Sequence, residues 1–153
     1  PVAKGGPAAR FILPDESGTE HHLSDYLGFW VVVYFYPRDN TPQCTQEACG
    51  FRDEILELRD LGVVVFGISL DSWRRHEAFA RKHFIPFHLL SDQDGQVARE
   101  YGVLKKFGPM KYARRQTFLV NPEGHIAKVY HKVKATQHSR EVVADIRALK
   151  ATE

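Results

Sequence analysis

Two cysteines, Cys44 and Cys49, are the residues of this sequence best suited to covalent chemistry. A thiolate is a strong nucleophile that peroxides and disulfides oxidise, and a second thiol nearby can close a disulfide with it. Thr41 and Pro42 come just before Cys44, and such a pair is typical of the N-cap and first turn of a helix. We therefore expect Cys44 in a first helical turn, where free backbone N–H groups and the helix dipole favour a thiolate.

The spacing of the two cysteines restricts how they can react. In an ideal helix Cys49 would lie roughly 7.5 Å along the axis from Cys44 and about 140° around it. A disulfide needs Cα atoms about 4.4–6.8 Å apart, so the two thiols cannot bond while the helix is intact. Gly50, a poor helix former, marks the place where unwinding would be easiest. The pattern indicates a redox cycle with a conformational step.

Simpler interpretations stay open at this point. Thr41 alone is well explained as a helix cap, and a single helical cysteine is more often a small buried hydrophobic residue than a nucleophile. Cys44 and Cys49 as metal ligands are a weak alternative, because no second ligand pair accompanies them. The neighbouring His21 and His22 would face opposite sides of a strand, so we expect no metal site.

The elements that must position these residues alternate between strand and helix. Residues 31–36 form a β-branched and aromatic run that ends at Pro37, as expected of a buried central strand. Helical periodicity follows from Pro42 to Leu61, where Gly62 supplies a stop. Further strands are predicted over residues 63–68, 87–90, 117–120 and 125–130, helices over 72–84, 94–101 and 142–149, a hairpin over 11–23, and a loop over 105–114. This order predicts an α/β fold with a central mixed sheet flanked by helices.

Composition limits the class of protein. Residues 1–153 fit one domain, with 43% hydrophobic and 26% charged residues. The longest apolar run, residues 29–36, is too short to cross a bilayer, and residues 1–10 lack the apolar core of a secretory signal. We therefore expect a cytoplasmic protein without a membrane partner. The net charge of +2 is spread along the chain, which does not favour nucleic-acid binding.

The stretch over residues 34–53 closely resembles the peroxiredoxin Q (bacterioferritin comigratory protein) subfamily of peroxiredoxins. The Pro-x-x-x-Thr-x-x-Cys signature of that family is met by Pro37, Thr41 and Cys44. The resemblance covers about residues 8–149 and continues through residues 68–72, 88–92, 101–103 and 115–120. It implies a thioredoxin-like fold, with the N-terminal hairpin added to the central sheet.

The resemblance also assigns roles to residues. Cys44 is the implied nucleophile, and Arg115 the arginine that stabilises its thiolate and the peroxide oxygens. Thr41 matches the threonine whose hydroxyl contacts the peroxide, and Pro37 the proline that shields the pocket from solvent. Glu47 is the implied partner that orients the arginine, as a carboxylate can do through paired hydrogen bonds.

A complete catalytic cycle is implied as well. Cys44 would reduce hydrogen peroxide or an organic hydroperoxide and become a sulfenic acid. Cys49 stands where one branch of the subfamily has its resolving cysteine, and would form an intramolecular disulfide that thioredoxin or a similar dithiol reduces. The chain would thus be a thioredoxin-dependent peroxiredoxin of the atypical 2-Cys type, with no cofactor or metal. Because both cysteines lie in one chain, a monomer is favoured.

Departures from the family pattern are few. Arg114 stands beside Arg115 and could take its place, although Arg115 has the family's spacing to Thr117. Gln43 replaces a glycine that is common just before the nucleophile.

Two other functions remain as alternatives. A thiol–disulfide oxidoreductase would exchange disulfides with proteins and consume no peroxide, but the sequence lacks the C-x-x-C motif of that class. A non-enzymatic redox sensor would use the disulfide to change a partner-binding surface.

Overall fold

Strand β3 (Trp30–Phe35) is the middle strand of a five-stranded sheet, and all six of its residues are buried. This is the central strand that the β-branched and aromatic run predicts. The computed structural model describes residues 2–152. In the sheet order β5-β4-β3-β8-β9, β3 is parallel to β4 and β4 to β5, whereas β8 is antiparallel to both β3 and β9. The other strands of this sheet are β4 (Val63–Ser69), β5 (His88–Ser91), β8 (Gln116–Val120) and β9 (Ile126–Tyr130).

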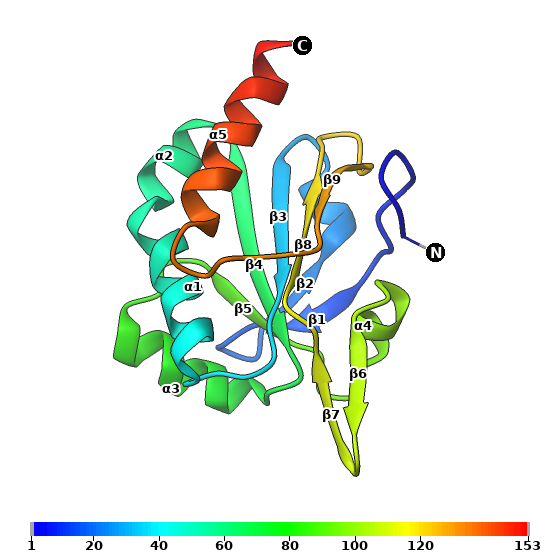
Figure 1. The fold of residues 1–153 in the computed structure, drawn as a ribbon, viewed down its shortest axis with the longest axis vertical. Helices are drawn as coiled ribbons and strands as arrows, with labels where there is room; N and C mark the ends of the chain where they lie inside the picture. Colours follow the sequence, from blue (N-terminus) through cyan, green and yellow to red (C-terminus); the bar gives the residue numbers. More distant parts are fainter. Residues whose placement is uncertain (1, 153) are drawn as a thin grey trace.

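Side chains of β3 alternate between two hydrophobic layers, as the period of a strand requires. Val32 and Tyr34 point into the layer covered by α1 (Pro42–Asp53), α2 (Ile55–Asp60), α3 (Trp73–His83) and α5 (His138–Ala151). Val31, Val33 and Phe35 point into the opposite layer. That layer is covered by α4 (Gln96–Glu100), the short helix η1 (Leu23–Tyr26) and the hairpin of β1 (Ile12–Pro14) and β2 (Glu20–His22) (Figure 1). The predicted mixed α/β architecture with an N-terminal hairpin is confirmed.

The helix predicted to run from Pro42 to Leu61 is divided in two. It is interrupted at Glu54, whose amide donates to the carbonyl of Phe51 only three residues back. Phe51 and Leu58 nevertheless both reach the same buried layer. Because the apolar spacing continues across the break, the sequence pattern does not reveal it. Gly62 follows with a positive φ of 73°, in agreement with its predicted role as a stop.

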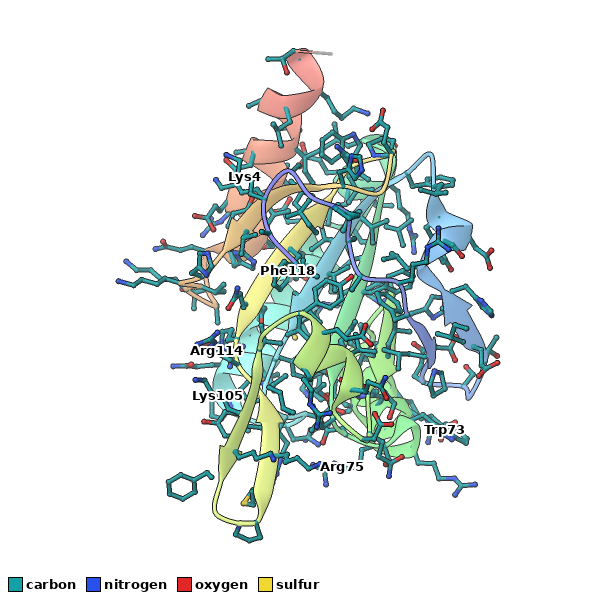
Figure 2. The ribbon with its side chains drawn as sticks, turned by 90° about the vertical axis from the view of Figure 1, so that its right-hand side faces the viewer. Lys4, Trp73, Arg75, Lys105, Arg114 and Phe118 are labelled. Atoms are coloured by element: carbon teal, nitrogen blue, oxygen red, sulfur yellow. The ribbon has the colours of Figure 1, made fainter. Side chains whose placement is uncertain are left out.

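The predicted loop over residues 105–114 is wrong. The structure places an antiparallel hairpin there, β6 (Leu104–Phe107) and β7 (Met110–Ala113), which projects from the rest of the molecule (Figure 2). Its residues are mostly exposed, so they lack the alternation of apolar and polar residues by which strands are recognised. The Gly108-Pro109 dipeptide between Phe107 and Met110 was the available turn signal.

Within residues 2–152, none of the helices combines the length and the apolar character that crossing a membrane would require.

Candidate active site

Cys44 lies in the first turn of α1, at the point where the loop after β3 enters the helix. Thr41 is extended, with φ −83° and ψ 151°, and Pro42 occupies the first helical turn, as predicted. The Thr41 side chain does not cap the helix, however. Its hydroxyl donates to the carbonyl of Arg38 at 3.0 Å and so forms a hydrogen bond within the loop that precedes α1. The Cys44 side chain is buried among the residues of the α1 side of the sheet, with 2% of its surface exposed.

Arg115 joins Cys44 to Glu47 although it is distant in sequence. It directly precedes β8, the strand that pairs with β3. One nitrogen of its guanidinium, Nη2, donates to Cys44 Sγ at 3.1 Å, and Nη1 donates to Glu47 Oε1 at 2.7 Å. Arg114 takes neither role, because its guanidinium donates to the Gly102 carbonyl at 3.1 Å. The structure thus brings together three of the predicted site residues and selects Arg115 over its neighbour.

Burial sets the electrostatics of this group. The Glu47 side chain has no exposed surface, and that of Arg115 only 15%. Burial raises the pKa of Glu47 to about 7, although the Arg115 guanidinium acts in the opposite direction. Burial also acts on Arg115, but the charges of Glu47 and Cys44 outweigh it and raise the pKa of the guanidinium. The arginine therefore stays cationic, and it can stabilise an anion at the cysteine sulfur.

Comparisons with known proteins agree with this geometry. The model of the AhpC/TSA family matches residues 5–129. Over 146 residues the chain is 48% identical to the putative peroxiredoxin bcp of Coxiella burnetii, covering 93% of this chain and 97% of that protein. The chain belongs to the AhpC/TSA family and, within it, to the Bcp/PrxQ peroxiredoxins. It is thus a thiol peroxidase.

Solved structures show that this peroxiredoxin has the thioredoxin-like fold of its family. Peroxidoxin BcpB from Mycobacterium tuberculosis superposes with a TM-score of 0.90 at 34% identity, covering 97% of this chain and 98% of that one. A bacterioferritin comigratory protein of Xanthomonas campestris, described for its alkyl peroxide reduction activity, superposes with a TM-score of 0.88 at 33% identity. The match covers 97% of this chain and 98% of that one.

One residue beside the site, Tyr34, was not predicted from the sequence, because it looks like an ordinary core residue of β3. Its hydroxyl and Oε2 of the predicted Glu47 are buried polar atoms without a hydrogen-bond partner in the described part of the chain. Burial, followed by the charge of Glu47, raises the pKa of Tyr34, so this hydroxyl stays neutral. Gly67 on the adjacent strand makes room for it, since a Cβ there would lie 2.7 Å from the Tyr34 hydroxyl oxygen. Its strand position gave no sign of this polar role.

A buried pair, Asp39 and His76, fixes the loop that carries Pro37 and Thr41. Asp39 Oδ2 lies 2.6 Å from His76 Nδ1, and Asp39 Oδ1 accepts from the Tyr36 hydroxyl at 2.6 Å. His76 Nε2 faces the Leu90 carbonyl at 3.0 Å, an atom that can only accept, so this nitrogen carries a proton. The loop is therefore tied to α3 and β5 by contacts that connect residues far apart in sequence.

Cys49 lies on the same unbroken helix as Cys44, and the structure holds both as free thiols. Its side chain is partly buried. Gly50 next to it packs closely on α5, because a Cβ at this position would lie 3.0 Å from Ser139 Oγ. In the intact α1 the two cysteines therefore occupy the positions that the sequence predicted, on one helix and without a bond.

Proposed function

We propose that this peroxiredoxin reduces hydrogen peroxide and organic hydroperoxides through a sulfenic acid on Cys44. The observation that carries the proposal is the guanidinium of Arg115, which donates to Cys44 Sγ at 3.1 Å while Glu47 holds it at 2.7 Å. This arrangement supplies a buried cation to the thiolate and to the oxygens on which charge develops. The Xanthomonas campestris relative, with its alkyl peroxide reduction activity, extends the proposed substrates to organic hydroperoxides.

In the first step the Cys44 thiolate attacks one peroxide oxygen, and the O–O bond breaks. The sulfur gains OH and is oxidised by two electrons, while the other oxygen leaves as water or an alcohol after taking from solvent the proton that Cys44 released on forming the thiolate. The Thr41 hydroxyl already donates to the Arg38 carbonyl, so its lone pairs remain to accept a hydrogen bond from the peroxide O–H. Pro37, half-buried at the end of β3, would shield the sulfur from solvent.

In the second step we propose that Cys49 resolves the sulfenic acid. Its thiol attacks the Cys44 sulfur, water leaves, and an S–S bond forms. Because the helix holds the two residues apart, α1 must first unwind between them. A thioredoxin-type dithiol would then transfer two electrons and two protons and restore both thiols.

The proposed cycle requires one chain and one domain. Both cysteines lie on α1 and Arg115 directly precedes β8 of the central sheet, so we propose a monomer in which residues 1–153 form a single catalytic unit. Reduction by a dithiol suits the reducing cytoplasm, where we propose that the protein acts.

Peroxide consumption with thioredoxin, thioredoxin reductase and NADPH tests the proposal. Cys44→Ser should have no turnover. Cys49→Ser should form one sulfenic acid per chain, which a dimedone-type probe captures, but should lose the intramolecular disulfide and most thioredoxin-driven turnover. Full activity of Cys44→Ser would contradict the role of Cys44, and full thioredoxin-driven turnover of Cys49→Ser would contradict the role of Cys49. Disulfide exchange with proteins in place of peroxide consumption would favour the oxidoreductase alternative.

A further inference from the structure

A second cluster of reactive side chains lies where the N-terminal hairpin meets β5. His21 on β2, His88 on β5, and Asp15 and Glu16 in the turn between β1 and β2 come together there. Asp15 Oδ2 lies 2.7 Å from His21 Nε2 and 3.3 Å from His88 Nδ1. Glu16 Oε2 lies 3.0 Å from His88 Nδ1. Asp15 Oδ2 and one nitrogen of each imidazole therefore lie within 4.8 Å of one another, and Glu16 adjoins this cluster through its contact with His88.

The carboxylates are oriented by contacts on their outer sides. Asp15 Oδ1 accepts from the amides of Ser17 and Thr19, at 2.8 and 3.1 Å, which leaves Oδ2 for the imidazoles. Glu16 Oε1 accepts from the amide of Leu89 at 3.1 Å and lies 3.2 Å from His88 Nδ1, whereas Oε2 lies nearer to that nitrogen, at 3.0 Å. Each carboxylate thus has one oxygen that accepts from a backbone amide.

His21 is fixed in a similar way. Its Nδ1 lies 2.7 Å from the Tyr26 hydroxyl, and its ring packs against Phe66 at 5.7 Å and against His88 at 4.3 Å between centroids. A metal-ligating imidazole usually donates its other N–H to a fixed polar group, which sets the tautomer and the ring orientation. The Tyr26 hydroxyl meets that requirement and leaves His21 Nε2 to face the Asp15 carboxylate.

From this geometry we propose that Asp15, Glu16, His21 and His88 form a binding site for a divalent transition-metal ion of the Zn²⁺ type. Nitrogen and oxygen donors of this kind bind Zn²⁺ at about 2.0–2.2 Å, which puts tetrahedral ligand atoms roughly 3.3 Å apart. The distances from His88 Nδ1 to Oδ2 of Asp15 and Oε2 of Glu16, 3.3 and 3.0 Å, are close to this value. The contact of 2.7 Å between His21 and Asp15 must lengthen, and the Glu16 carboxylate must move towards the other ligands to serve as the fourth.

Charge and access are consistent with an exchangeable ion. Two carboxylates beside two neutral imidazoles carry a charge of −2, which a divalent cation balances. The Asp15 and His21 side chains are 4% and 12% exposed, whereas that of His88 is 45% exposed and leaves a route from solvent.

The ion would fasten the N-terminal hairpin to the edge of the main sheet. Its ligands come from the β1–β2 turn, from β2 and from β5. Glu16 already joins the turn to β5 through its contacts with His88 and with the Leu89 amide. Trp73, labelled in Figure 2, packs on the same turn, since a Cβ at Gly18 would lie 3.5 Å from its ring. The proposal is independent of the peroxidase chemistry at Cys44.

Calorimetric titration with Zn²⁺ tests the site in the full chain carrying Cys44→Ser and Cys49→Ser, which removes both thiols as ligands. We expect one ion per chain and a higher unfolding temperature with Zn²⁺. His88→Gln should weaken binding at least about tenfold and abolish the thermal shift, as loss of a metal contact does. His21→Gln should do the same, whereas His22→Gln on the same strand should bind like the parent.

Two results would overturn the proposal: no binding by the parent, or binding that His21→Gln and His88→Gln leave unchanged. His88→Gln keeps the test independent of folding, because His88 is half-exposed and its loss leaves no buried group unpaired beyond Glu16. Cobalt(II) supplies a second measurement on the wild-type chain. The site predicts tetrahedral d–d absorption without a sulfur-to-cobalt charge-transfer band, whereas such a band would place the ion on the cysteines.

Discussion

The two ends of α1 are held by different forces. At its start, Cys44 and Glu47 are joined to Arg115 by hydrogen bonds that depend on charge. Towards its end, Phe51 is fully buried and stacks on Tyr34 with ring centroids 5.0 Å apart. Between the two ends, Gly50 packs so closely on Ser139 that a Cβ at position 50 would lie 3.0 Å from the Ser139 hydroxyl oxygen.

This difference indicates which end of the helix can respond to oxidation. When Cys44 becomes a sulfenic acid, its negative charge is lost, and with it much of the attraction to Arg115. The packing of Phe51 does not depend on the oxidation state of sulfur. We therefore expect the first half of α1 to unwind towards Cys49, while Phe51 and α2 remain in place.

Among the changes that test this difference between the two ends of α1, replacing Arg115 by glutamine should have the largest effect. It removes the cation from the thiolate and from the developing oxyanion, so the rate constant for reaction with peroxide should fall by about 10²–10³-fold, the usual cost of such a donor. Stopped-flow measurement of Cys44 oxidation checks this. Arg114→Gln is the matched control and should react like wild type, since the Arg114 guanidinium donates to the Gly102 carbonyl and not to Cys44. Equal loss in both variants would remove the special role of Arg115.

The pH dependence of the free energy of unfolding tests the contribution of Glu47 at the Cys44 end of α1. The pKa of Glu47 is about 7 when folded, above its ordinary value of 4.5, so the folded state binds this proton more tightly than the unfolded state. The free energy of unfolding should therefore fall as pH rises from about 4.5 to 7 and level off above that, by roughly 3–4 kcal/mol at about 1.4 kcal/mol per pKa unit. Denaturant unfolding of Glu47→Gln should lack this slope, and exposed Glu123→Gln should keep it. An identical slope in all three proteins would contradict the assignment.

Stiffening the middle of α1 should give the smallest effect. Alanine at position 50 gains about 0.5–1 kcal/mol of helix stability, but its Cβ would crowd Ser139. The pair Gly50→Ala with Ser139→Ala removes that conflict and should slow disulfide formation by up to about fivefold. Sulfenic acid formation should be unchanged, and Ser139→Ala alone should resemble wild type. A slower reaction with peroxide would show that α1 moves before oxidation.

Local signals in the sequence were sufficient to predict most of the fold. The apolar run of β3 and the Thr41-Pro42 start of α1 are set by nearby residues, so both were predictable. The break at Glu54 was not, because the helical spacing of apolar residues continues across it. The hairpin of β6 and β7 was missed because it buries little apolar surface.

In the candidate site, too, residues of one local segment were predictable, whereas contacts between distant elements were not. Cys44, Thr41 and Pro37 share one short segment, and family resemblance supplied Arg115 and Glu47. The partnership of Asp39 with His76 depends on α3 packing beside the loop, which no local pattern encodes. His21 and His22 were predicted not to share a metal, because neighbours on a strand face opposite sides; the imidazole that packs against His21 belongs instead to β5. Only the sheet brings His88 there.

Hydrogen exchange in the reduced and the disulfide forms tests the central claim most directly, namely that α1 must open between Cys44 and Cys49. We expect the amides of residues 45–49 to lose protection in the disulfide form, whereas those of α2 (Ile55–Asp60) and β3 keep it. In the reduced form the amides of α1 should be protected from Thr45 onwards. A disulfide form whose α1 amides remain as protected as in the reduced form would contradict the account.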